Sequence, residues 1–164
     1  MKSLKIGAIC VLLSLCAFRS FAQQPKQQEQ NLLTSAYSEP DYNKPKLFAD
    51  LPERMTLDVA ALETLFSLEV SKPVNLFVAK GFNFHGVIVS KSNAADQNSQ
   101  SVVVKSSNRQ GAILTFTRNR NSGGSFYYIG RILSLKHGDA YEIKQEEDGS
   151  TVLLKKDLYD LISD

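Results

Sequence analysis

Apolar and polar side chains alternate with a period of two along most of the chain after residue 73. The first two alternating runs, residues 74–78 and 82–88, flank Lys80 and Gly81, and this arrangement predicts a β-hairpin. Five more strands are expected, separated by turn-rich stretches: residues 101–105, 112–118, 125–134, 140–145 and 151–154. Because no helical pattern lies between them, the sequence predicts a mainly β domain, a small antiparallel meander that closes into a barrel. Closure would remove exposed strand edges, and a two-sheet sandwich is the alternative.

Two glycines, Gly86 and Gly130, lie inside predicted strands. A glycine within a strand marks a bulge or a bend more often than a ligand site. We therefore expect both residues to help the sheet curl.

Two helices are expected at the ends of this strand region. Residues 56–68 form the N-terminal helix, with Thr56 as its N-cap. Four apolar residues recur there at helical spacing: Val59, Leu62, Leu65 and Phe66. We expect this stripe to face the core rather than a partner, as in most single amphipathic helices. A short C-terminal helix is expected over residues 155–162.

The first 22 residues have the pattern of a secretory signal peptide. Lys2 and Lys5 precede an apolar stretch over residues 6–17, and small residues at Ser20 and Ala22 fit a cleavage site after Ala22. The apolar stretch is shorter than the ~20 residues that span a bilayer. The pattern therefore predicts an exported protein, periplasmic or extracellular after cleavage, with no transmembrane segment in the mature chain.

A second route of processing stays open. Residues 13–16 resemble a bacterial lipoprotein box, and cleavage before Cys16 would leave a lipid-anchored protein. Both cysteines, Cys10 and Cys16, precede the Ala22 site. A chain cut after Ala22 therefore contains no cysteine, which excludes disulfides and thiol catalysis.

Composition divides the rest of the chain into two segments. Residues 23–50 are rich in Gln, Pro, Ser, Asn and Lys, with few apolar residues, and this composition predicts a flexible linker. Residues 51–164 have the length and apolar content of a single β-rich domain.

Charge is distributed unevenly along the chain. Removing the leader changes the formal charge from +2 to −1, because Lys2, Lys5 and Arg19 are lost. Residues 72–136 carry nine Lys or Arg and one acid, Asp96, whereas both flanking segments are acidic. We expect the acidic flanks to fold back over the basic strands. The alternative is an exposed basic face for an anionic partner, formed by Arg109, Arg118 and Arg120.

Catalytic and metal-binding motifs are absent from the sequence. It contains no HExxH pair, no Gly-x-Ser-x-Gly elbow and no phosphate-binding glycine loop, so no metal or cofactor is expected. The remaining candidate is His137, Gly138 and Asp139 with Arg131 on the preceding strand. A tight turn accounts for His-Gly-Asp more simply than a catalytic base does.

Aromatic residues on the strand before this turn are candidates for ligand contact. Consecutive strand residues point to opposite faces, so Tyr127 faces away from Phe126 and Tyr128. The candidate ligand-binding residues are therefore Arg109, Arg118, Arg120, Tyr127, Arg131 and His137.

The sequence favours a non-enzymatic binding or interaction module of the cell envelope. Its expected partner is a protein, a peptide or an anionic glycan, and export argues against nucleic acid. The alternatives are a small enzyme with a site near His137, Asp139 and Arg131, and a structural subunit marked by an exposed apolar patch or edge.

Overall fold

The computed structural model describes residues 43–93 and 98–162. The predicted signal peptide, Cys16 and residues 23–42 of the predicted linker lie outside these residues. No helix in the described part of the chain combines the length and the apolar character needed to cross a membrane.

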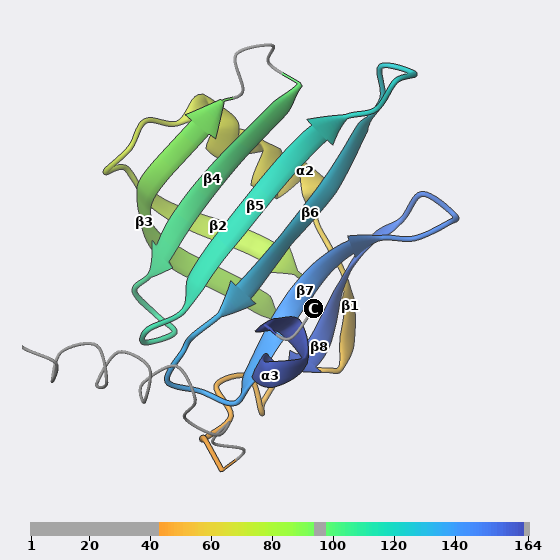
Figure 1. The fold of residues 1–164 in the computed structure, drawn as a ribbon. Coiled ribbons are helices and arrows are strands. Elements are labelled where there is room, and N and C mark those ends of the chain that lie inside the picture. The colour runs from red at the N-terminus through yellow and green to blue at the C-terminus, as the bar shows by residue number, and fades with distance from the viewer. Residues whose placement is uncertain (1–42, 94–97, 163–164) are drawn as a thin grey trace, which may run out of the picture. The chain divides into compact units, whose positions relative to one another are not determined.

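Eight antiparallel strands form one sheet that curls into a half-barrel (Figure 1). The strands are β1 (Arg54–Thr56), β2 (Pro73–Ala79), β3 (Phe82–Asn93), β4 (Ser99–Ser106), β5 (Ile113–Arg120), β6 (Phe126–Leu133), β7 (Asp139–Gln145) and β8 (Thr151–Asp157). Their order in the sheet is β1-β8-β7-β6-β5-β4-β3-β2, so strands β2 to β8 form a meander and β1 is added beside β8.

All seven predicted strands occur, as β2 to β8, and one further strand, β1, was not predicted. The described strands belong to a single sheet, so the sandwich alternative is wrong. The two outer strands β1 and β2 are not paired along their length. Only one bridge joins these edges, between Leu57 and Ala79, where the Asp58 N–H also donates to the Val78 carbonyl at 2.8 Å.

Two short helical segments are present besides the sheet. The α-helix α2 covers Val59–Glu63, and a 3₁₀ helix continues it over Thr64–Ser67. Asp58 caps α2 by accepting from the Ala61 N–H, so the expected cap at Thr56 is wrong, since Thr56 belongs to β1. The C-terminal helix α3 covers only Leu158–Ile162, because residues 155–157 extend β8.

The core lies on the concave face of the curled sheet. Alternate residues of the strands point inward and are buried, as the period of two requires. Leu62 and Leu65 of the helical segment are fully buried in the same core, with Val59 and Phe66 packed against it. The expected core-facing stripe is thus confirmed.

Gly86 and Gly130 let neighbouring strands approach closely. A Cβ atom at Gly86 would lie 2.4 Å from the Lys105 carbonyl oxygen, and one at Gly130 would lie 2.2 Å from the Thr115 carbonyl oxygen. Real Cβ atoms do not come so close to backbone. These two positions therefore permit the sharp curl of β3 against β4 and of β6 against β5.

The last part of the predicted linker packs on the domain. Residues 44–50, here called the strap, contribute Phe48, which is fully buried against the rings of Phe82 and Tyr141. The carboxylate of Asp139 accepts hydrogen bonds from the N–H groups of Leu47 (2.6 Å) and Phe48 (2.9 Å). A linker boundary at residue 50 is therefore wrong, because one aromatic side chain and one buried acid hold the strap in place.

Candidate functional site

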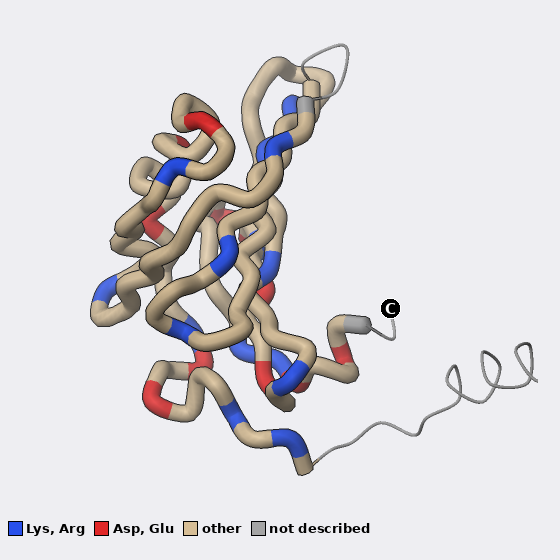
Figure 2. Tube along the Cα trace, turned by 90° about the vertical axis from the view of Figure 1, so that its left-hand side faces the viewer, with Lys and Arg blue, Asp and Glu red and all other residues tan. Residues whose placement is uncertain are grey.

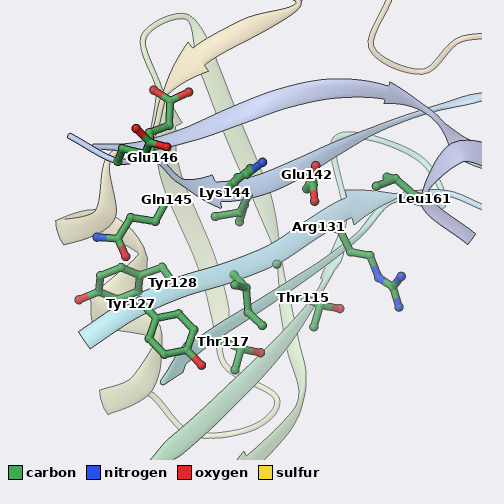
Figure 3. Close-up of a pocket in the computed structure, with 14 residues that line it drawn as sticks. Thr115, Thr117, Tyr127, Tyr128, Arg131, Glu142, Lys144, Gln145, Glu146 and Leu161 are labelled. Atoms are coloured by element: carbon green, nitrogen blue, oxygen red, sulfur yellow. The ribbon is translucent and has the colours of Figure 1, made fainter. Parts of the chain in front are cut away.

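A groove of about 850 Å³ opens on the convex face where β6 and β7 separate (Figure 3). The two strands are paired only from Gly130 opposite Ile143 to Leu133 opposite Ala140. On the N-terminal side of Gly130, β6 stays paired with β5, and after Ile143 β7 stays paired with β8. The β5–β6 and β7–β8 hairpins therefore diverge (Figure 1). A groove of this volume is in the range of small-ligand sites, about 300–1,000 Å³.

Uncharged side chains line the groove along β5 and β6. Thr115 and Thr117 point outward from β5, and Tyr127 and Ile129 point outward from β6. Tyr127 is 39% exposed and Ile129 is 48% exposed. Large apolar surface thus remains accessible at the point where the sheet splits.

Charged side chains line the opposite wall and the closed end. Arg131 and Glu142 stand opposite each other on β6 and β7, and Lys144, Glu146 and Glu147 follow along β7 and its turn. Arg131 and Lys144 make no ion pair with any residue that the structure describes.

Glu146 is engaged from outside the groove. Both of its carboxylate oxygens accept from the guanidinium of Arg54 on β1, and this hydrogen bonding lowers the pKa of Glu146. The Glu146 carboxylate therefore helps to hold β1 against the β7–β8 hairpin.

Arg118 lies on the concave side of the sheet and is held by several groups. Its guanidinium pairs with Glu63 at 2.5 Å, and it lies over the rings of Phe66 (4.6 Å) and Phe126 (4.9 Å). The Arg118 side chain is 23% exposed. Burial, followed by the charge of Glu63, raises the pKa of nearby Tyr128, whose ring stacks on Phe116.

Arg109 is likewise engaged with the acidic N-terminal flank. It donates to both carboxylate oxygens of Asp50 (2.7 and 2.6 Å) and to the Leu47 carbonyl (3.0 Å). These hydrogen bonds from Arg109 lower the pKa of Asp50. Acidic and basic positions are interspersed over the domain (Figure 2).

Arg120 lies over the Phe126 ring at 4.9 Å, near the tip of the β5–β6 hairpin. Of the three arginines expected to form a basic face, Arg109 and Arg118 therefore form ion pairs within the domain. The acids in those pairs come from the acidic N-terminal flank.

The structure does not gather His137, Asp139 and Arg131. Asp139 is 1% exposed and holds the strap, and His137 Nδ1 lies 2.9 Å from Ser134 Oγ in the turn before β7. Arg131 points outward from β6 into the groove, whereas Asp139 lines a separate hollow with Lys46 and Asp157. The described residues contain no cluster of three His, Cys, Asp or Glu side chains placed to hold a metal.

Among the candidate residues from the sequence, the groove brings together Tyr127 and Arg131. Sequence reasoning missed Thr115, Thr117, Ile129, Glu142 and Lys144. The outward positions of predicted strands could have indicated these residues. No local sequence pattern predicts the split between β6 and β7, because the split depends on where the pairing of the two strands ends.

The described part of the chain is thus a curled antiparallel half-barrel whose sheet splits at a groove with aromatic, apolar and charged walls. Comparison of the chain with family models, with curated proteins and with solved structures finds no match.

Proposed function

We propose that this protein is exported and that its β domain is a non-enzymatic binding module of the cell envelope, which holds its partner in the groove between β6 and β7. The observation that carries this proposal is the groove at the split in the sheet, where the exposed Tyr127 and Ile129 lie beside Arg131 and Lys144, two charges that make no ion pair with a described residue. Concave sites with apolar walls and a few polar groups are typical of ligand binding.

The charges favour a protein or peptide partner over an anionic glycan. Arg109 and Arg118 are engaged with Asp50 and Glu63. The groove itself places Arg131 and Lys144 beside the carboxylates of Glu142 and Glu147. Such a mixed surface offers no concentration of positive potential for a polyanion.

Two outward isoleucines provide a matched test of the groove. Ile129 lines it, whereas Ile113, which is 40% exposed on β5, does not. The ¹⁵N-labelled protein would be titrated with heparin, as a sulfated glycan, and with eight-residue peptides in which valine alternates with threonine, lysine or glutamate. We expect peptides to shift the amide resonances of Thr117, Tyr127 and Lys144, and Ile129→Ser to weaken binding by about tenfold, the effect of losing one buried aliphatic contact.

Ile113→Ser should leave the affinity within a factor of two. The proposal fails if no probe shifts the groove residues, or if both isoleucine variants bind as the unaltered protein does.

Exposed apolar residues elsewhere on the convex face support a second candidate, a structural subunit. Phe77, Val87 and Val89 are each at least 39% exposed on β2 and β3. A protein that self-associates at micromolar concentration in sedimentation velocity, and becomes monomeric on Val87→Lys but not on Ile129→Ser, would favour this candidate.

A further inference from the structure

The part of β6 at the groove, residues 126–129, is here called the open edge. It pairs with β5 on one side and has no paired strand on the other within the described chain. Continuing the β6–β7 register past Gly130 and Ile143 would place Ile129 opposite Lys144 and Tyr128 opposite Gln145, and the pairing ends before both. The sheet therefore contains a strand edge in its interior as well as at its margins.

Backbone groups on the open edge point toward the groove at alternate residues. The Arg120 N–H donates to Asn98 on the β4 side, whereas the Asn121 N–H donates to Ser125 on the β6 side. The backbone groups of odd-numbered residues of β5 thus form hydrogen bonds with β6. Tyr127 and Ile129 stand opposite such residues, so their own backbone groups form hydrogen bonds with β5. Because ladder bonds alternate in direction along a strand, the N–H and C=O groups of Phe126 and Tyr128 face the groove.

The facing part of β7 has the same alternation. The Glu146 N–H donates to Ser150 on the β8 side, so the backbone groups of Gln145 face the groove. This segment carries Lys144, Glu146 and Glu147, and charges of this kind discourage strand pairing.

The open edge lacks the features that protect the outer strands of the sheet. β2 begins with Pro73 and has a register irregularity between Phe77 and Ala79, and β1 is only three residues long and carries Arg54. By contrast, the open edge reads Phe-Tyr-Tyr-Ile, with no charge, no proline and no irregularity in its register with β5. Aromatic and β-branched residues of this kind favour strand pairing, and an unprotected edge is a template for it.

We propose that the partner is an extended peptide that adds to the open edge of β6 as a further strand, an inference that rests on the binding function proposed above. Main-chain hydrogen bonds to Phe126 and Tyr128 supply affinity in this mode, and the side-chain surroundings supply specificity. One set of alternate peptide side chains lies over Tyr128 and Ile143, so these positions take apolar residues. The other set lies beside Tyr127, Lys144 and Glu147, so these positions take polar residues of either charge.

Backbone methylation of the peptide tests strand addition without altering the protein. The probe is the eight-residue peptide that binds best in the titration above, made in three forms: unmodified, N-methylated at its odd residues, and N-methylated at its even residues. Only one methylated form removes donors that face β6. We expect that form to bind about tenfold more weakly or worse, and the other to bind within a factor of three.

Amide hydrogen exchange provides the second readout. In the free protein the Tyr128 amide should exchange faster than those of Tyr127 and Ile129, which face β5. Peptide binding should slow exchange at Tyr128 by at least about tenfold and leave Tyr127 and Ile129 little changed. Both results together support strand addition.

The other outcomes separate this inference from the binding function. Peptide binding at the groove with equal response to both methylated forms, or binding of heparin alone, overturns strand addition and leaves the groove as a binding site. If neither heparin nor any peptide shifts the groove resonances, both the binding function and strand addition are overturned. Protection of Tyr128 that rises with protein concentration, without peptide, identifies a second copy of the chain as the occupant and also overturns the inference.

Discussion

The two halves of β6 differ in what lies beside them. Residues 130–133 lie between β5 and β7, and the inward Ile132 is fully buried. Within the described chain residues 126–129 pair only with β5, and the inward Phe126 and Tyr128 are half-buried. The inward face of β6 is thus fully buried at Ile132 in the second half and only half-buried in the first, whereas outward side chains are exposed in both halves.

The two halves of β6 also differ in the contacts that stabilise the structure around them. The paired half leads toward the start of β7, where Asp139 holds the strap and the Gly138 N–H donates to the Pro45 carbonyl. Behind the open half, on the concave side, Arg118 is held between Phe66 and Phe126 with Glu63. These contacts involve the strap and the concave side of the sheet, and none of them uses the outward side chains Tyr127 and Ile129.

The largest expected effect comes from adding a side chain at the boundary. Gly130→Ala places a Cβ atom 2.2 Å from the Thr115 carbonyl oxygen, so β6 must move away from β5. We expect urea unfolding to show a loss of about 2–4 kcal/mol in stability. Gly123→Ala is the control, since its Cβ meets only Asn121 Oδ1 at 3.4 Å, and a similar loss in both variants would contradict the role given to Gly130.

A smaller effect distinguishes the two arginines of this region. Arg118→Leu leaves the partly buried Glu63 without its partner and removes contacts with two rings, so we expect a loss of about 1–2 kcal/mol, reduced by partial exposure. Arg131→Leu on the convex face breaks no ion pair with a described residue and should change stability by less than about 0.5 kcal/mol. Equal losses in urea unfolding would mean that Arg131 is also structural.

The smallest effect concerns the strap near the paired half. Arg109 lowers the pKa of Asp50 in the folded protein, so the Asp50 carboxylate adds stability above the pKa of the unfolded chain. This contribution is lost as pH falls through the lowered folded pKa. At pH 6 the free energy of unfolding of the unaltered protein should exceed that of Asp50→Asn by less than about 1 kcal/mol. The difference should begin to shrink at about pH 4 and vanish only below the lowered folded pKa of Asp50.

The control for this effect is the same substitution in an Arg109→Met background, where the pH-dependent effect of Asp50→Asn should be much smaller, because Arg109 is the largest cause of the lowered pKa. A difference that persists unchanged to pH 3 would show that Asp50 acts through its shape rather than its charge.

Much of the sheet could be predicted because strand alternation is a local signal. Phe82, Phe84 and Ile88 identify the inward face of β3 from their spacing alone. β1 has only three residues, Arg-Met-Thr, and its pairing with Leu153 and its neighbours on β8 is set by tertiary structure. Phe48 belongs to a polar segment, and its burial depends on Asp139, about ninety residues away.

The site was predictable only in part for the same reason. Tyr127 and Arg131 could be named as candidates from their residue types and strand positions. The engagement of Arg109 and Arg118 joins residues more than fifty positions apart, with Asp50 and Glu63 as partners. No local pattern distinguishes an arginine that meets such a partner from one that stays exposed.

The pairing of β1 with β8 has a consequence for how the chain folds. Arg54 pairs with Leu154, one hundred residues later, so the sheet cannot be completed until β8 has been synthesised. Contacts this distant in sequence slow folding, because the entropy of closing the loop is lost before the contacts form. The hairpins β2 to β8 can assemble in order as the chain emerges, whereas β1, made before any of them, can pair only after β8 has been made.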